Sequence, residues 1–146
     1  MVTVEAVDAV TDEIVEALER LLPQLSSLSR PVDSEYLAAI VGSPATRLLV
    51  ARDDAGVIAG SLTLAVFRIP TGIRAWIEDV VVDERRRGRG IGEALTRRAI
   101  RLARDAGART IELTSRPSRE AANRLYERVG FVRRETNVYR FELPDD

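Results

Sequence analysis

The stretch RRRGRGIGEALTRRAI, Arg85–Ile100, places three glycines at alternate positions behind a run of arginines and then continues into a helical pattern. Glycine reaches positive φ and lets a ligand approach the backbone closely, at a cost in conformational entropy. A strand that turns through glycines into a helix directs several N–H groups at one point, where the helix N-terminus adds about half a positive charge. The stretch therefore predicts an anion-binding loop, with phosphate or pyrophosphate as its natural ligand.

Two common nucleotide-binding patterns do not fit this loop. The P-loop pattern GxxxxGK[ST] needs a lysine, and the chain contains none. The dinucleotide pattern GxGxxG fails because Glu93 stands where the third glycine is required after Gly88 and Gly90. A nucleic-acid module that uses RRRGRG as a phosphate stripe is a further alternative. The net charge of −1 and the absence of interleaved aromatic residues argue against it, so no nucleic-acid partner is expected.

Composition limits the chemistry that the chain can perform. Its 146 residues suit one domain, residues 1–146, with a core of its own. Cysteine and histidine are both absent, which excludes thiolate and imidazole metal ligands, a thioester on the enzyme and a histidine base. Catalysis must therefore use carboxylates, tyrosine, hydroxyls or backbone amides, and no metal is expected. No apolar run approaches the roughly 18 residues of a membrane span, and the first residues do not resemble a signal peptide, so we expect a cytoplasmic protein with no membrane partner.

The two halves of the chain differ in charge. Residues 1–73 hold ten acidic residues against five arginines, a balance of −5, and residues 74–146 hold thirteen against seventeen, a balance of +4. This asymmetry favours an anionic ligand for the second half and a cationic one near the first.

Periodicity predicts alternating strands and helices, and hence an α+β domain with a mostly antiparallel sheet and helices on both faces. A β-α-β unit is expected after Arg74. Expected strands are residues 2–7, 47–53, 56–69, 74–82, 110–114 and an edge strand, NVYRFEL, at 137–143. Expected helices run from Thr11 as N-cap to about Leu21, over 34–41, from the glycine run to Gly107, and from Pro117 to Gly130.

The residues Arg87-x-x-Gly90-x-Gly92 match a known motif, Q/R-x-x-G-x-G/A. With IEDVVV before it, an Ala/Leu helix after it, and NRLYERVGF some thirty residues later, the chain resembles the GNAT superfamily of acetyl-CoA-dependent N-acetyltransferases. The resemblance covers roughly Ala75 to Glu142. It implies a three-layer α/β/α fold with six to seven strands, in a single domain.

The resemblance also implies how acetyl-CoA, the co-substrate, would bind. The pyrophosphate would lie on the amides of the glycine loop, and the pantetheine arm would pair like an added strand with the backbone of the preceding strand. An amide of that strand would also polarise the thioester carbonyl. The loop residues are Arg87, Gly88, Arg89, Gly90, Ile91 and Gly92, and the strand residues are Val80, Val81 and Val82.

A general base is needed because an ammonium group must lose a proton before it attacks a thioester. Glu78 and Asp79 interrupt an apolar strand, where burial of a carboxylate is costly unless it is paired or used. Alternation places Glu78 with Val80 on one face and Asp79 with Val81 on the other, so only one acid is expected to face the acceptor. The resemblance favours Glu78, acting directly or through water. The alternative is that one or both carboxylates bind arginines structurally.

The second helix supplies the remaining candidates. Tyr126 stands where the family has a general-acid tyrosine, which would protonate the leaving thiolate; the alternative is a core aromatic. Asn123, one turn earlier, is a candidate ligand of the pantetheine arm. The family commonly has asparagine seven residues before the tyrosine, and this chain has Arg119 there, which suits a CoA phosphate or, alternatively, solvent.

These observations predict an acyltransferase that moves an acetyl group from acetyl-CoA to an amine by direct attack in a ternary complex. A non-catalytic CoA-binding regulatory domain on the same fold is the alternative. The acceptor is a small-molecule or peptide amine that the sequence does not identify, and the acidic first half favours a cationic one. A homodimer through the last strands is consistent with the pattern.

Overall fold

A computed structural model describes residues 1–26 and 31–144. The chain divides into two compact units, Met1–Thr114 and Ser115–Asp146.

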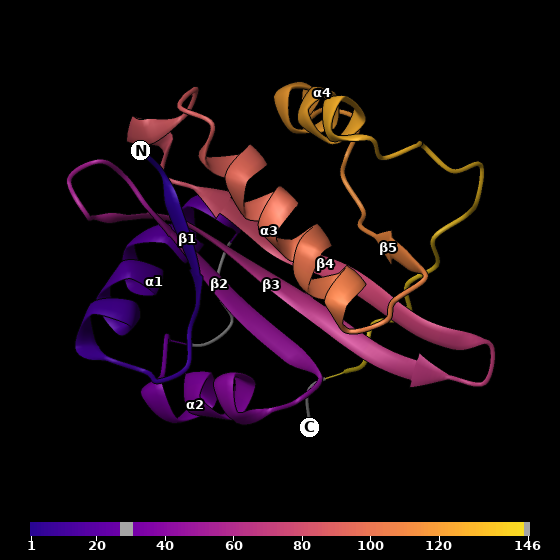
Figure 1. Cartoon of the computed structure of the whole chain (residues 1–146), viewed down its shortest axis with the longest axis horizontal. Helices are drawn as coiled ribbons and strands as arrows, with labels where there is room; N and C mark the ends of the chain where they lie inside the picture. The colour runs from indigo at the N-terminus through magenta and orange to yellow at the C-terminus, as the bar shows by residue number, and fades with distance from the viewer. Residues whose placement is uncertain (27–30, 145–146) are drawn as a thin grey trace. The chain divides into compact units, whose positions relative to one another are not determined.

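The first unit is built on one five-stranded sheet in the order β1-β2-β3-β4-β5 (Figure 1). Neighbouring strands are antiparallel except β4 and β5, which are parallel. The expected α+β fold with a mostly antiparallel sheet is confirmed, and the described residues form five strands rather than six or seven. Its elements are β1 (Thr3–Ala6), α1 (Asp12–Leu25), α2 (Ser34–Gly42), β2 (Thr46–Arg52), β3 (Ile58–Ile69), β4 (Gly72–Val82), the 3-10 turn η1 (Glu84–Arg86), α3 (Ile91–Asp105) and β5 (Thr110–Glu112).

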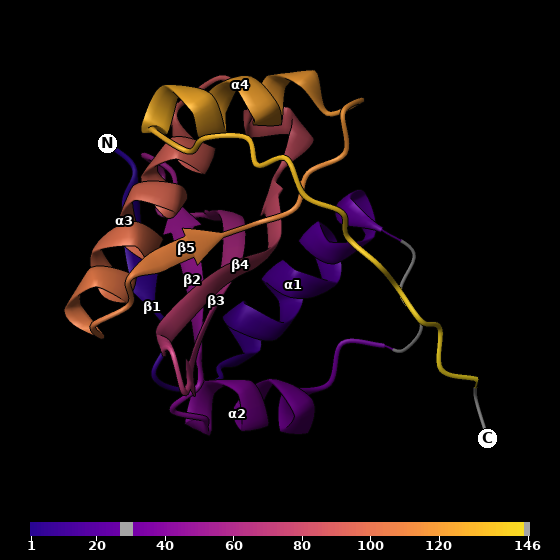
Figure 2. The ribbon, with the colours of Figure 1, turned by 90° about the vertical axis from the view of Figure 1, so that its right-hand side faces the viewer.

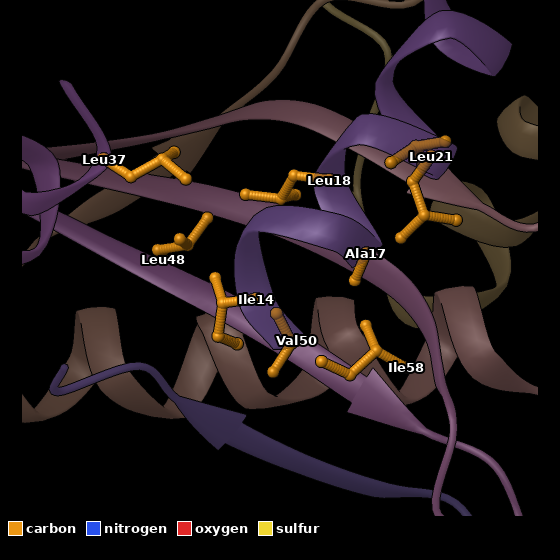
Figure 3. Close-up of a cluster of buried hydrophobic side chains, with 9 residues drawn as sticks. Ile14, Ala17, Leu18, Leu21, Leu37, Leu48, Val50 and Ile58 are labelled. Atoms are coloured by element: carbon orange, nitrogen blue, oxygen red, sulfur yellow. The ribbon is translucent and has the colours of Figure 1, made fainter. Parts of the chain in front are cut away.

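Helices α1 and α2 cover one face of the sheet. Thr11 caps α1 as expected, since its Oγ1 accepts a hydrogen bond from the N–H of Ile14 at 3.3 Å. The apolar stripe of α1 packs on alternate residues of the central strands (Figure 3). The buried cluster comprises Ile14, Ala17, Leu18, Leu21, Leu37, Leu48, Val50, Ile58 and Val81.

Helix α1 is longer than the sequence indicated. We expected it to end near Leu21 because Pro23 follows, but it continues through Pro23 to Leu25. Proline in the last turn removes one backbone donor and ordinarily costs stability. The burial of Leu21 at 0% exposure and the packing of Leu22 and Leu25 on the same cluster offset that cost. No helix of the described ranges is long and apolar enough to cross a membrane.

Helix α3 covers the opposite face of the sheet (Figure 2). Its fully buried residues include Leu95, Ala99 and Ala103, at the spacing of one helical stripe. Gly60 of β3 lies beneath its first turn, and a Cβ built there would come 2.9 Å from Cγ2 of Ile91. The missing side chain at Gly60 therefore sets how closely the N-terminus of α3 approaches the sheet. Gly107 ends the helix in the left-handed region, φ +87°, as expected.

The described part of the second unit, residues 115–144, contains one helix, α4 (Glu120–Val129), which ends at Gly130 with φ +123°. The expected edge strand at 137–143 is wrong: residues 131–144 form neither helix nor strand. A strand needs a neighbouring backbone to complete its hydrogen bonds, and alternation alone cannot supply one. The segment nevertheless keeps its alternating apolar side chains.

The close approach at Gly60 leads to a test of the fold. Gly60→Ala should lower the free energy of unfolding by about 1–3 kcal/mol, because the added methyl meets a β-branched side chain of α3 and the carbonyl oxygen of Val81 at 3.1 Å. Urea denaturation followed by circular dichroism measures the change. Gly42→Ala is the matched control, because nothing lies within 4 Å of its added methyl and its φ is not positive. Equal stability of the Gly60 variant and the wild type would contradict the packing described.

Candidate active site

A β-bulge in β4 determines which residues face which side of the sheet. Thr63 of β3 pairs with Glu78, whereas Ser61, two residues earlier, pairs with Val81, three residues later. Asp79 has φ +50°, a left-handed conformation that is uncommon outside glycine and more frequent for aspartate and asparagine. The extra residue is the bulge. Its position coincides with the two acids that interrupt the apolar pattern.

The bulge overturns the predicted alternation. Residues directly opposite in an antiparallel pair share a face. Glu78 therefore lies on the face of Thr63, and Val81 lies on the same face through Ser61, so Glu78 goes with Val81 rather than with Val80. Simple alternation fails here because the inserted residue reverses the order of faces. Glu78 and Asp79 are both exposed, so the premise of buried carboxylates is also wrong.

The outer edge of β4 is open over the same residues. Strand β5 pairs only with Arg74, Ala75 and Trp76. Among the described residues of the first unit, no strand pairs with that edge from Ile77 to Val82. Such an edge presents backbone N–H and C=O groups to an extended ligand. The segment Val80–Val82 predicted to hold the pantetheine arm is thus part of an open edge.

The glycine loop follows this edge directly. Gly88 and Gly90 adopt φ +79° and +78°, and nothing lies within 4 Å of the position that a Cβ would take at either residue. Gly90 is the N-cap of α3 and, having no side chain, makes no capping hydrogen bond to the first turn. The first-turn N–H groups therefore lack a side-chain cap, beside open space, at the positive end of a fifteen-residue helix. Ile91 and Gly92 are the first two residues of that helix.

The arginines around the loop are not equivalent. Arg86 is committed to the protein: its Nε donates to Asp53 at 2.6 Å and its NH1 donates to Asp83 at 2.9 Å. Arg85, Arg87 and Arg89 are exposed. Of the arginines in this run, the exposed ones are those available to an anion at the loop.

Asp83 is the centre of an ion-pair network at the start of the loop. It is 3% exposed, and its carboxylate accepts hydrogen bonds from NH1 of Arg20, NH1 of Arg86 and the N–H of Arg85 at 2.9, 2.9 and 3.1 Å. Burial alone would raise the pKa of this carboxyl, but the N–H of Arg85 and the guanidinium groups of Arg86 and Arg20 outweigh burial and lower its pKa. Asp83 is therefore ionised at neutral pH.

The network ties the loop to α1, to the start of β3 and to the β2–β3 turn. Arg20 of α1 also donates to the carbonyl of Ile58 at 2.8 Å, which connects α1 to the start of β3. Gln24 of the same helix accepts a hydrogen bond from the N–H of Glu84 at 2.9 Å. Asp53 belongs to the β2–β3 turn, where its other oxygen accepts from Ala55 and Val57. The turn before the glycines is thus held from α1, from β3 and from a hairpin.

Neither this network nor the role of Gly60 was predicted from the sequence. The capping role of Asp83, directly before Glu84–Arg86, could have been predicted, because aspartate is a preferred N-cap residue. The pairing with Arg20 could not, because the two residues are 63 positions apart, and an arginine on an amphipathic helix is ordinarily solvated.

The second unit holds Arg119, Asn123 and Tyr126. Asn123 donates from Nδ2 to the carbonyl of Arg116 at 2.9 Å, so its amide closes the loop before α4. Arg119 is the N-cap of α4 and is exposed, and its side chain makes no capping hydrogen bond. Asn123 therefore has a structural bond in addition to any ligand contact through its Oδ1.

Tyr126 is 7% exposed, and its ring packs edge-on against Phe131 with centroids 5.9 Å apart. Burial raises the pKa of its hydroxyl, and the nearby charge of Arg119 lowers it only in part. The phenol therefore keeps its proton at neutral pH and is chemically able to donate it. The ring also contributes to the packing of the unit. A core aromatic was the alternative to a catalytic role for this residue, and the two are compatible.

Known proteins resemble the chain over most of its length. Residues 11–131 match the sequence model of the acetyltransferase (GNAT) family. The chain is 32% identical over 122 residues to a probable glucosamine 6-phosphate N-acetyltransferase 2 of Oryza sativa subsp. japonica, an alignment that covers 77% of this chain and 72% of the relative.

Solved structures share the fold. A putative acetyltransferase from Agrobacterium tumefaciens str. C58 superimposes with a TM-score of 0.80 at 26% identity, over 96% of this chain and 99% of the other. An aminoglycoside acetyltransferase from an uncultured soil metagenomic sample gives a TM-score of 0.80 at 20% identity, over 99% and 97% of the two chains.

The network around Asp83 predicts a pH-dependent loss of stability. Asp83→Asn should lower the free energy of unfolding at pH 7 by about 1.5–3 kcal/mol, the usual worth of hydrogen bonds to a charged group. A carboxyl whose folded pKa is lowered stabilises the fold above the unfolded pKa of about 3.9 and loses that contribution as the pH falls through the folded value. The difference between wild type and variant should therefore shrink below about pH 4.

Urea denaturation at pH 7 and at pH 3 checks this prediction. Asp8→Asn, at an exposed position, is the control and should change little at either pH. If Asp83→Asn and the wild type have the same free energy of unfolding at pH 7, the ionised carboxylate does not hold the loop. The same conclusion follows if the variant is less stable by the same amount at both pH values.

Proposed function

The chain belongs to the GNAT acetyltransferase family, and from this premise we propose that it transfers an acetyl group from acetyl-CoA to a primary amine by direct attack in a ternary complex. The observation that carries the proposal is the N-terminus of α3, which has no side-chain cap, behind two left-handed glycines and beside the open edge of β4. A ligand with an anionic group followed by an extended, amide-containing arm suits both features: the anion suits the N-terminus of α3, and the arm suits the open edge of β4. Residues 1–146 act as one acetyltransferase domain, and no metal takes part.

The glycine loop binds the pyrophosphate of acetyl-CoA. Backbone N–H groups between Arg87 and Gly92 donate to its oxygens, and the end of the α3 dipole adds attraction for negative charge. The exposed guanidinium groups of Arg87 and Arg89 supply charge-assisted hydrogen bonds. Arg86 stays with Asp83 and Asp53 and fixes the loop instead of the ligand.

The edge of β4 receives the pantetheine arm. Its amides pair with the backbone of Val80, Val81 and Val82, as an added strand pairs with a sheet. Main-chain bonds need no special side chain, which is why three valines can form a binding site. A backbone N–H of this edge donates to the thioester oxygen as negative charge develops on it.

Glu78 acts as the general base, directly or through one water. It accepts a proton from the ammonium group of the acceptor, so that the nitrogen lone pair can attack the thioester carbonyl. The exposed position of Glu78 beside the bulge makes it reachable for a substrate. Asp79 shapes the bulge through its left-handed backbone and takes no part in proton transfer.

Tyr126 acts as the general acid when the carbon–sulfur bond breaks. It donates its phenolic proton to the leaving sulfur and regains one from solvent. Its raised pKa supports this role, because the hydroxyl remains protonated over the whole neutral range. In the second unit, Arg119 binds a CoA phosphate, and Asn123 binds the arm through Oδ1.

The acceptor is a small-molecule or peptide amine. The relative from Oryza sativa subsp. japonica is a probable glucosamine 6-phosphate N-acetyltransferase 2. A relative from Schizosaccharomyces pombe is an N-alpha-acetyltransferase 30. It is 34% identical over 73 residues, which cover 50% of this chain and 48% of the relative. The first name specifies a small-molecule amine, and the second specifies an N-alpha amine. The balance of −5 over residues 1–73 supports a cationic acceptor.

Gly90→Val should reduce acetyl-CoA affinity at least about 100-fold, because the side chain fills the open space at the loop and strains a backbone at φ +78°. Isothermal titration calorimetry measures the affinity. Gly56→Val is the matched control: Gly56 has φ +80°, nothing lies within 4 Å of its added Cβ, and it belongs to the β2–β3 turn. Both variants should lose roughly 1–3 kcal/mol of stability, and only the Gly90 variant should lose affinity. Retained affinity in that variant would disprove the loop as the pyrophosphate site.

Glu78→Gln and Tyr126→Phe should each lower kcat on the order of 100-fold with little change in acetyl-CoA affinity. They should differ in pH dependence. The deficit of Glu78→Gln should close as the pH approaches the pKa of the acceptor amine, which then deprotonates unaided, whereas the deficit of Tyr126→Phe should persist. Initial rates from pH 6 to pH 10 with a panel of amines measure both.

Asp79→Asn is the control for this pair. Asparagine tolerates the left-handed conformation at φ +50°, so the bulge is preserved and the rate should stay near that of the wild type. A pH–rate profile of Glu78→Gln that parallels the wild type would remove Glu78 as the base. A larger loss in Asp79→Asn than in Glu78→Gln would transfer that role to Asp79.

A further inference from the structure

The face of the sheet that carries Glu78 continues along β4 toward the β3–β4 hairpin. Thr63 of β3 pairs with Leu48 on one side and with Glu78 on the other, and Leu48 belongs to the core beneath α1 and α2. Glu78 therefore lies on the face that these helices cover. Trp76 and Arg74 lie on the same face, because side chains at alternate positions of a strand share a side. The three residues form one row, with the aromatic residue between an acid and a base.

Helices α1 and α2 leave this row accessible. Over β2 the same face is buried, and Leu48 is only 4% exposed. Over β4 the face opens, since Glu78 is exposed and Trp76 and Arg74 are half-buried. Phe67 of β3, which pairs with Arg74, is 38% exposed. A carboxylate beside an accessible indole is a surface on which a ligand with a cationic amino group can lie.

Two arginines meet at the hairpin end of the row, which lies at the opposite end of the sheet from the glycine loop (Figure 1). A Cβ built at Gly72 would lie 3.3 Å from Nη1 of Arg74 and 3.3 Å from Cδ of Arg109. The missing side chain at Gly72 thus lets both arginine side chains pass over the same spot. Nη2 of Arg74 donates to Oγ1 of Thr71 at 3.0 Å, which is a neutral partner.

Neither of these guanidinium groups is neutralised. Within residues 1–26 and 31–144, no carboxylate forms an ion pair with Arg74 or Arg109. Two like charges beside each other repel, and an anion that accepts hydrogen bonds from both would remove the repulsion. A carboxylate suits this place, because its two oxygens match the fork of a guanidinium group.

We propose that the acceptor is an elongated amine with a carboxylate at its far end, and that Arg74 and Arg109 bind this carboxylate. The ammonium group lies at Glu78 and the middle of the acceptor lies on Trp76. The inference rests on the proposed function, which assigns the acceptor amine to Glu78. Such an acceptor is cationic at its amino end, in agreement with the negative balance of residues 1–73, and anionic at the other.

The row sets the length of this acceptor. A strand rises about 3.3 Å per residue, so Arg74 lies about 13 Å from Glu78 along β4. An extended peptide of four residues spans about the same length. A short peptide with free amino and carboxyl ends therefore fits both ends of the row, and a peptide of two residues, about 7 Å long, does not reach from one to the other.

Fluorescence titration tests the recognition of the carboxylate. The chain contains one tryptophan, so its fluorescence reports on ligands that cover Trp76. Tetra-alanine and its C-terminal amide are titrated without acetyl-CoA, so that the signal does not depend on acetyl transfer. The acid should bind at least about 10-fold more tightly than the amide, whereas dialanine and its amide should bind equally. Equal affinities of tetra-alanine and its amide, or no response of the fluorescence to either, would overturn the proposal.

Substitutions at the hairpin end test which residues bind the carboxylate. Arg74→Gln and Arg109→Gln should each raise the dissociation constant of tetra-alanine about 10-fold and leave that of its amide unchanged. Arg68→Gln is the matched control and should change neither value, because Arg68 is exposed, pairs with Ile73 and lies on the opposite face of β3. An equal effect of Arg68→Gln, or equal weakening of acid and amide in the other two variants, would overturn the assignment.

Acetylation of the same peptides separates this inference from the proposed function. With acetyl-CoA present, tetra-alanine should have a lower KM than its amide and a similar kcat. If the protein binds the acid preferentially and transfers no acetyl group, the recognition of the carboxylate stands and the proposed function is wrong. If acid and amide are acetylated with the same KM, the proposed function stands and the recognition of the carboxylate is wrong.

Discussion

Asp83 is the first residue after β4. Its carboxylate joins the turn Glu84–Arg86 to helix α1. Its two guanidinium partners and one backbone N–H come from Arg20, Arg86 and Arg85. A buried carboxylate is costly unless it is paired in this way. Arg86 is engaged by Asp83 and Asp53, which fixes the path of the turn into the glycines. The N-cap of α3 is Gly90, which has no side chain to cap the first N–H groups. The proposed pyrophosphate site follows from how this turn is held.

The bulge at Asp79 and the shortness of β5 complete the proposed donor site. The bulge brings Glu78 to the face of Val81 and leaves both acids exposed, whereas β5 stops pairing at Trp76 and leaves the rest of the β4 edge open. Each feature is a departure from regular sheet geometry. Gly60 adds a third constraint, since it lets α3 lie close enough to the sheet for its N-terminus to adjoin that edge.

Local pattern predicted most of the elements, because helical stripes, glycine stops and hairpin turns are signals carried by neighbouring residues. The anion-binding loop was predicted this way, and its motif lies within residues 11–131, which match the family. The face of Glu78 was predicted wrongly, since strict alternation cannot anticipate a bulge. The Arg20–Asp83 pair joins residues far apart in sequence and was missed. The strand expected at 137–143 was wrong, because pairing depends on a partner edge that a one-dimensional pattern does not contain.

Isothermal titration of the wild-type protein with acetyl-CoA decides whether the glycine loop and the β4 edge form one donor site. ATP, NAD and a short DNA duplex serve as competing anions that share phosphate but lack the pantetheine arm. We expect micromolar-range binding of acetyl-CoA and much weaker binding of the other three, because only acetyl-CoA can occupy the glycine loop and the β4 edge together. Absence of acetyl-CoA binding, or equal binding of ATP, would contradict the assignment of these two features as one donor site.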